Sequence, residues 1–124
     1  MSVILIVEDN EKNMKLVRDV LQVKGYSTLE AGTGEDGIRL AAEHHPDLIL
    51  MDIQLPGISG IEALKVLRAN PATAAVPAIA VTASVMQQDR NLITGAGFDG
   101  YIGKPLNLKE FLEAVKAMLE RGRQ

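Results

Sequence analysis

The sequence predicts an α/β fold in which five parallel strands alternate with five helices. Three short segments, at residues 3–7, 48–51 and 78–81, are apolar at every position. Strands have this composition when helices cover both faces of a sheet, because neither face then meets water. Amphipathic helical patterns lie between these segments, so strands and helices alternate along the chain. The length of 124 residues suits one domain of this kind.

Two weaker segments complete the set of strands, at residues 26–30 and 100–102. The segment at 26–30 has fewer apolar residues and is expected to form an edge strand. The first helix is predicted by apolar residues at helical spacing, namely Met14, Val17, Val20 and Leu21. Gly25 then stands where a helix commonly ends.

Three later helices begin with a polar residue that precedes an acid by three positions, the spacing of a helix N-terminal cap. The pairs are Thr33 and Asp36, Ser59 and Glu62, and Asn107 and Glu110. The helix expected after residue 85 has the weakest apolar pattern. Strict alternation favours right-handed crossovers. We therefore expect a (βα)5, flavodoxin-like, doubly wound five-stranded parallel sheet in a three-layer αβα arrangement.

Composition excludes several classes of function. There are no cysteines, which removes disulfides, zinc-thiolate sites and thiol nucleophiles. The net charge of −3 argues against a nucleic-acid-binding surface. The first residues, MSVILIVED, do not have the basic start expected of a signal peptide, and no apolar run approaches the ~20 residues that span a bilayer. We expect a soluble, cytoplasmic protein that binds neither nucleic acid nor membrane.

Polar residues that could bind a ligand or take part in a reaction follow four of the predicted strands. Glu8 and Asp9 come after the first strand, Asp52 after the third, Thr82 after the fourth and Lys104 after the fifth. Ligands of doubly wound sheets bind at the carboxyl ends of the strands, so we expect these side chains to lie together. Each of them alone is more often a cap or a turn residue. Their joint order along four strands is what favours a site.

Three carboxylates repel one another unless positive charge lies among them, and one lysine leaves the group short of it. Hard oxygen ligands suit Mg²⁺, with Mn²⁺ as an alternative. A carboxylate beside such a cation can act as a nucleophile towards phosphorus. The cation and Lys104 would stabilise the charge on the transferred group. The residues therefore predict phosphoryl chemistry on a carboxylate.

The motifs that carry these residues resemble the receiver domain family of response regulators. They are Glu8–Asp9–Asn10, PDLILMDIQLPGISG at 46–60, AVTAS at 80–84 and GKP at 103–105. The segments VEDNEKNMKL and MDIQLPGISG are similar in sequence to single-domain cell-cycle regulators of the DivK type. The resemblance covers nearly the whole chain and implies one receiver domain over residues 1–124 without an output domain.

The resemblance also implies a role for each site residue. Asp52 would be the phosphoacceptor, Lys104 the cation that binds the phosphoryl group, Thr82 the switch hydroxyl and Tyr101 the switch aromatic. The metal ligands would be Glu8, Asp9, Asp52 and the backbone carbonyl of Gln54. Lys104–Pro105 would be a cis peptide bond. Two features differ from the common pattern. Glu8 stands where many members of the family have Asp. Gln54 and Ser84, which flank the phosphoryl site, differ from the residues of the chemotaxis regulators.

The partners implied are a histidine kinase or histidine phosphotransferase domain as donor and a downstream protein effector. The chain would be a phosphoacceptor with slow autohydrolysis rather than a conventional enzyme. We expect its signalling surface between Val85 and Lys109, because the fourth helix has few apolar anchors.

The sequence is open to two alternative interpretations. Gly32–Gly37 reads GxGxxG, the spacing of a dinucleotide-binding loop. Glu35 and Asp36 would then meet a pyrophosphate with like charge, so loop and cap glycines are the preferred interpretation. The other alternative is a receiver-fold interaction module that is never phosphorylated. Such a module would lack an acceptor Asp, a Thr or a Lys, and this chain has all three.

Overall fold

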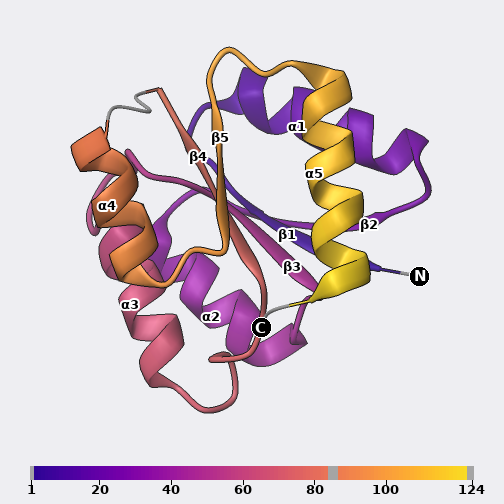
Figure 1. Cartoon of the computed structure of the whole chain (residues 1–124). Helices are drawn as coiled ribbons and strands as arrows, with labels where there is room; N and C mark the ends of the chain where they lie inside the picture. The colour runs from indigo at the N-terminus through magenta and orange to yellow at the C-terminus, as the bar shows by residue number, and fades with distance from the viewer. Residues whose placement is uncertain (1, 84–86, 123–124) are drawn as a thin grey trace.

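Five parallel strands form one sheet, and a helix follows each of them (Figure 1). The structure is a computed structural model that describes residues 2–83 and 87–122. The strands are β1 Val3–Val7, β2 Ser27–Ala31, β3 Leu48–Asp52, β4 Ala78–Thr82 and β5 Gly100–Gly103. The helices are α1 Glu11–Val23, α2 Gly34–His44, α3 Gly60–Ala69, α4 Gln87–Ala96 and α5 Leu108–Arg121. The strand order is β2-β1-β3-β4-β5, which confirms the predicted flavodoxin-like fold.

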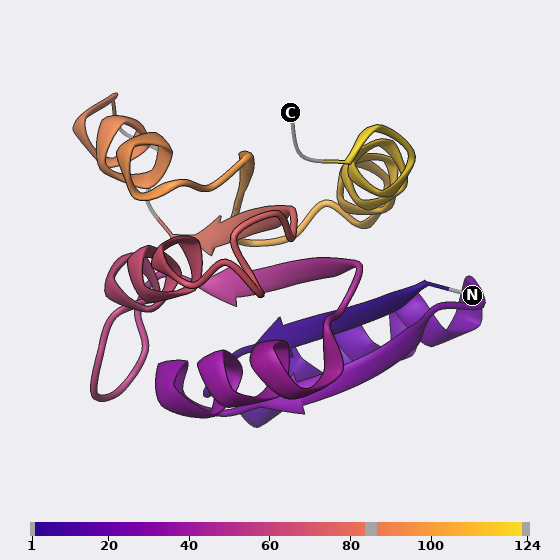
Figure 2. The same ribbon diagram turned by 90° about the horizontal axis from the view of Figure 1, so that it is seen from below.

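Helices cover both faces of the sheet, as the continuous apolar runs predict. Figure 2 shows α2, α3 and α4 on one side of the sheet and α1 and α5 on the other. Alternate residues of β1 serve the two cores, with Leu5 and Val7 in the first and Ile4 and Ile6 in the second. Among the described residues, no helix is both long and apolar enough to cross a membrane.

The three predicted helix caps are present. Thr33 Oγ1 accepts from the backbone N–H of Asp36 at 3.1 Å, and Ser59 Oγ accepts from that of Glu62 at 3.2 Å. The third cap joins Asn107 to Glu110 at 3.1 Å. A fourth cap was not anticipated: Asn10 Oδ1 accepts from the N–H of Asn13 at 3.0 Å. It starts α1 directly after Glu8 and Asp9, and thereby fixes the chain that carries both acids.

Strand boundaries differ from the predicted ones by a residue. β2 is an edge strand, as expected, but it runs from Ser27 to Ala31. β3 and β4 each continue one residue further than their apolar runs, to Asp52 and Thr82. These polar residues stay in the sheet because Asp52 pairs with Val81, and Thr82 pairs with Gly103. Asp52 and Thr82 are therefore held by strands, whereas Glu8, Asp9 and Lys104 follow directly after the ends of β1 and β5.

The glycines of the GxGxxG segment have a packing role. A side chain at Gly34 would collide with Ile58, and one at Gly37 would collide with Val7 of β1. Close packing of α2 against the sheet accounts for these two glycines without a bound nucleotide. The exposed carboxylates in the first turn of α2 remain as the sequence suggested.

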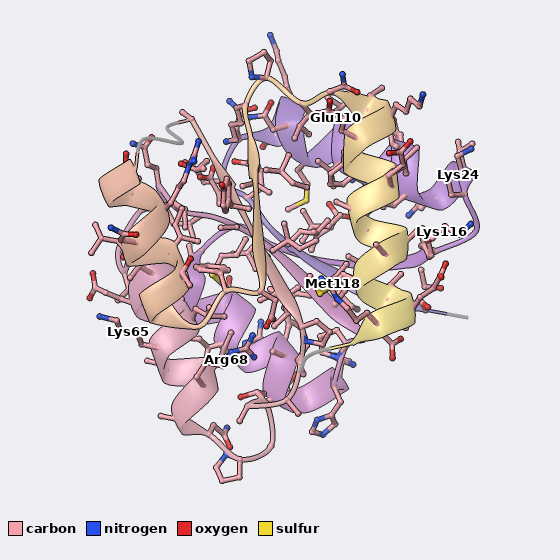
Figure 3. The ribbon with its side chains drawn as sticks, in the orientation of Figure 1. Lys24, Lys65, Arg68, Glu110, Lys116 and Met118 are labelled. Atoms are coloured by element: carbon pink, nitrogen blue, oxygen red, sulfur yellow. The ribbon has the colours of Figure 1, made fainter. Side chains whose placement is uncertain are left out.

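One side chain of α3 ties three segments together at the edge opposite the acids. Arg68, labelled in Figure 3, forms an ion pair with Asp99 at 3.0 Å, and the two side chains are only 12% and 17% exposed. The same guanidinium donates to the carbonyl of Gly97 at 3.0 Å and to that of Val76 at 2.5 Å. Asp99 also accepts from the N–H of Ala78 at 2.9 Å. The end of α4 is thus anchored to α3 and to the start of β4.

Candidate functional site

The three acids of the predicted site converge at the carboxyl ends of β1 and β3. Glu8, Asp9 and Asp52 each offer a carboxylate oxygen, and these atoms lie within 4.8 Å of one another. Glu8 and Asp52 are buried, at 7% and 5% exposure, whereas Asp9 is exposed. Two acids therefore form the floor of the site and the third faces solvent.

The strand register brings Glu8 and Asp52 together. Val7 of β1 pairs with Met51 of β3, so the residue after each pair stands at the same edge of the sheet. The backbone N–H of Glu8 donates to the carbonyl of Ala31 at 3.0 Å, which continues the pairing with β2 beyond the end of β1. The central position of these two strands determines where the acids meet.

Asp52 is held by the loop that follows it. Its Oδ1 accepts from the backbone N–H of Gln54 at 2.9 Å. Gly60 opens α3 against the same backbone, since a side chain at this position would collide with the carbonyl oxygen of Asp52. The backbone N–H of Gly60 donates to the carbonyl of Ile53 at 3.0 Å. The loop and the first turn of α3 therefore set the orientation of this acid.

Lys104 reaches both buried acids. Its ammonium donates to Asp52 Oδ2 at 2.8 Å and to Glu8 Oε1 at 3.3 Å. Its own backbone N–H donates to the carbonyl of Thr82 at 2.8 Å, which keeps the chain after β5 next to β4. The Lys104–Pro105 peptide bond is cis, as expected. A single positive charge is shared between two carboxylates.

This sharing shows in the pKa values. Burial raises the pKa of Glu8 above 4.5, a hydrogen bond from the N–H of Asn10 opposes the rise, and the charge of Asp52 adds to it. Burial by itself would lower the pKa of Lys104, but the hydrogen bond and charge of Asp52 and the charge of Glu8 outweigh it and raise that pKa above 10.5. Lys104 is therefore a cation at neutral pH.

The structure places three of the four other predicted site residues. Thr82 is buried at the end of β4, and its neighbour Val81 pairs with Asp52. Gln54 contacts Asp52 through its backbone N–H. Tyr101 lies on β5 and is 40% exposed, with the guanidinium of Arg90 over its ring. Ser84 lies outside the described residues.

An apolar cavity beside the acids was not predicted. It has a volume of about 200 Å³ and lies between α1 and the chain that leads into α5. Glu8, Asp52 and Lys104 line one end of it, and apolar side chains line the rest, among them Val17, Leu106 and Phe111. Its only signal in the sequence is Leu106 directly after Lys104–Pro105. That residue alone does not indicate a cavity.

The donor set fits a hard divalent cation. When all four groups are ionised, three carboxylates and one ammonium carry a net charge of −2. Carboxylate oxygens that converge at this spacing are the ligands that Mg²⁺ prefers, and Mg²⁺ needs only one or two of them because it keeps several waters. The cluster can therefore hold a metal ion without any other protein side chain.

This fold and this rim of acids and lysine define a receiver domain. The model of the protein family described as "Response regulator receiver domain" matches residues 4–116. The chain belongs to the response regulator receiver domain family.

Particular relatives narrow the resemblance. The chain is 47% identical to the polar-differentiation response regulator DivK of Brucella ovis over 94% of both chains, and it is equally identical to DivK of Brucella suis. The receiver domain of sensor histidine kinase PA1611 from Pseudomonas aeruginosa PAO1 is 33% identical, with a TM-score of 0.90 over 96% of this chain and 98% of that one. That structure has a magnesium ion coordinated in its active-site cleft. A CheY-like receiver domain protein from Methanospirillum hungatei JF-1 is 29% identical, with a TM-score of 0.90 over 98% and 95% of the two chains.

These findings assign the chain to two-component signal transduction, as a receiver domain similar to DivK. Receiver domains are phosphorylated by histidine kinases. The acidic group of Glu8, Asp9 and Asp52 is consistent with an aspartyl phosphate site.

Proposed function

We propose that Asp52 accepts a phosphoryl group from a phosphohistidine of a histidine kinase or histidine phosphotransferase domain, in a reaction that needs Mg²⁺ or Mn²⁺. The observation that carries this proposal is the position of the Asp52 carboxylate. It is buried, hydrogen-bonded to the ammonium of Lys104 at 2.8 Å, and lies within 4.8 Å of two further carboxylates. A fixed carboxylate next to one cation, with ligands for a second, suits attack on phosphorus.

In the proposed step a carboxylate oxygen of Asp52 forms a bond to phosphorus while the bond from phosphorus to the donor's imidazole nitrogen breaks. The nitrogen keeps the electron pair, and the product is an acyl phosphate on Asp52. Lys104 then donates to a phosphoryl oxygen in place of the carboxylate oxygen that it now contacts. Hydrolysis by water would later restore the carboxylate and release inorganic phosphate.

The cation would be held by Glu8, Asp9, Asp52 and the backbone carbonyl of Gln54. When bound, it neutralises charge on the transferred phosphoryl group. Asp9 is exposed and Glu8 already accepts from Lys104 and from the N–H of Asn10. We infer that Asp9 is the stronger ligand of the two, because Glu8 has other partners.

Thr82 would turn phosphorylation into a change of shape. Its hydroxyl stands one residue beyond the partner of Asp52 on β4 and would move to donate to the phosphoryl group. Tyr101 would follow, and a separate protein effector would read the altered surface between Val85 and Lys109. Of this surface, Val85 and Met86 lie outside the described residues.

Phosphorylation with a small donor tests the proposal. Acetyl phosphate with Mg²⁺ should add one acid-stable, base-labile phosphoryl group to the wild-type chain, as intact-mass spectrometry would detect. Asp52→Asn should remove the label, whereas Asp36→Asn, which also loses an acid, should keep it. Labelling of Asp52→Asn at the wild-type rate would contradict the assignment of the acceptor. A wild-type chain that takes no label from any donor would instead favour a phosphorylation-independent interaction module.

A further inference from the structure

The first half of α4 contacts β5 through a cation and an aromatic ring. The guanidinium carbon of Arg90 lies 5.6 Å from the centroid of the Tyr101 ring. This distance is within the range at which a cation is attracted to the face of an aromatic ring. Tyr101 as a whole residue is 40% exposed, and Arg90 covers a side chain that would otherwise meet more solvent.

The register of the sheet places this ring beside the switch threonine. Ala80 pairs with Tyr101, and Thr82 pairs with Gly103. Paired residues and residues two positions apart share a face of a sheet, so Thr82 and Tyr101 lie on the same face. Ala80 belongs to the core that α4 packs against, which identifies this face as the one under α4. Tyr101 is the diagonal neighbour of Thr82 on β5, and the direct partner of Thr82, Gly103, has no side chain.

The two halves of α4 are held in different ways. Ile93 and Ala96 in its second half are buried in the core, and Arg68 binds the carbonyl of Gly97 just after it. Asp89 and Arg90 in the first half are only partly buried. The contact with Tyr101 therefore joins β5 to the half of the helix whose described side chains, Asp89 and Arg90, are only partly buried. Such a contact can be exchanged without unpacking the core.

We propose that Arg90 is a positioning residue that holds the Tyr101 ring at the surface while Asp52 is unphosphorylated. This inference rests on the proposed function, in which Tyr101 takes a second position when Thr82 moves. The ring leaves Arg90 when it turns towards Thr82. A cation–π contact at an exposed site changes an equilibrium by a factor of roughly two to five, which is the bias that Arg90 supplies.

The position of the ring can be followed by fluorine NMR of the full chain with 3-fluorotyrosine. The chain has two tyrosines, so Tyr26→Phe leaves Tyr101 as the single reporter. The probe is beryllofluoride with Mg²⁺, titrated into this protein and into its Arg90→Gln, Arg90→Lys and Lys65→Gln variants. Lys65 is exposed on α3 and controls for the loss of one positive charge (Figure 3).

Arg90→Gln should convert at a beryllofluoride concentration two to five times lower than the wild type, and its resonance without the probe should lie nearer the converted position. Arg90→Lys should lie between these two proteins, and Lys65→Gln should match the wild type. An unchanged or higher midpoint for Arg90→Gln would overturn the proposal.

A double-mutant cycle tests the contact without reference to phosphorylation. Urea unfolding of the wild type, Arg90→Gln, Tyr101→Leu and the double variant should give a coupling that corresponds to a two- to fivefold change in the unfolding equilibrium. Zero coupling would overturn the proposal. If the wild type does not respond to beryllofluoride at all, the phosphorylation switch itself fails, and the Arg90–Tyr101 contact then stands or falls on this cycle.

Discussion

The ammonium of Lys104 lies 2.8 Å from Asp52 Oδ2 and 3.3 Å from Glu8 Oε1, so one positive charge serves two buried acids. A phosphoryl group on Asp52 would compete for the ammonium of Lys104, and a cation beside Glu8 would compete with that ammonium for the carboxylates. The charge of Lys104 is thus divided between the two carboxylates, and binding of a phosphoryl group or a cation would redistribute it.

In the metal-free protein, the free energy of unfolding should fall as the pH rises through the folded pKa of Glu8. Burial and the charge of Asp52 raise that pKa above 4.5, so between the unfolded and folded values the folded state binds more protons. The associated stability is present below about pH 4.5 and is lost above the folded pKa. Lys104 stays charged in this range because its own pKa is raised above 10.5.

Glu8→Gln should remove this pH dependence. Urea unfolding in EDTA between pH 4 and pH 7 should show the variant gaining stability relative to the wild type as the pH rises. Glu113→Gln, which alters an exposed acid of α5, should run parallel to the wild type. A constant difference between Glu8→Gln and wild type across this range would contradict the prediction.

Metal binding should depend on Asp9 more than on Glu8. Asp9 is exposed, whereas Glu8 is already engaged by Lys104 and by the N–H of Asn10. Titration of Mg²⁺ or Mn²⁺ should show weaker binding in both Asp9→Ala and Glu8→Ala, with a larger loss in Asp9→Ala. The supporting residues of a metal site commonly change affinity by about 10- to 100-fold, and we expect a direct ligand to reach the upper end. Unchanged affinity in Asp9→Ala would exclude Asp9 as a ligand.

Thr82→Ala should separate phosphorylation from its readout. The variant keeps Asp52, Lys104 and the acids, so acetyl phosphate should still label it. Without the hydroxyl, the phosphoryl group makes more similar contacts in the two conformations. A ligand shifts a conformational equilibrium only through a difference in its interaction energy with the two states. The beryllofluoride-induced change at Tyr101 should therefore be largely lost, and Thr82→Ser should restore it. A normal response in Thr82→Ala would mean that another contact transmits the signal.

Most of the fold could be predicted because helix-covered strands leave a simple pattern in the sequence. Runs such as VILIV mark buried parallel strands, and the caps at Thr33, Ser59 and Asn107 mark where helices begin. The site followed from the same pattern, since residues at the carboxyl ends of parallel strands meet at one edge. This edge is where Glu8, Asp9 and Asp52 converge.

The rest depends on side-chain geometry that no pattern records. Nothing in the sequence shows that Lys104 reaches Glu8 as well as Asp52, because this depends on how far a flexible side chain extends. The partners of Arg68 are up to 31 residues away in the chain, and arginine on an amphipathic helix usually faces solvent. The contact of Arg90 with Tyr101 is likewise a matter of rotamers. Long-range polar contacts of this kind leave no pattern in the sequence.

Hydrogen exchange should locate the moving segment in α4. Residues 87–97 should change protection between the metal-free protein and the protein with beryllofluoride and Mg²⁺, because Asp89 and Arg90 in the first half of α4 are only partly buried. The region around Tyr101 should change with it, whereas α1 should change less. A response confined to α1 and α2 would overturn this assignment of the signalling surface and leave the acceptor at Asp52 in place.

Arg68 should contribute to stability and not to phosphorylation. Arg68→Met leaves the largely buried carboxylate of Asp99 without its cation and removes the donor from the carbonyls of Val76 and Gly97. Breaking a buried pair from one side costs roughly 3–5 kcal/mol, and the partial exposure of this pair favours about 3 kcal/mol. Lys65→Met on the exposed side of α3 is the matched control and should change stability by less than about 0.5 kcal/mol.

Two further measurements separate the lost cation from a general loss of packing. Asp99→Asn should cost less in the Arg68→Met background than in the wild type, because the unpaired charge has then been removed. Labelling of Asp52 by acetyl phosphate should persist in Arg68→Met, since Asp99 and Ala78 pair at the end of β4 that is remote from Thr82. Equal stability of Arg68→Met and Lys65→Met in urea would show that the network adds nothing, and the end of α4 would then need another anchor.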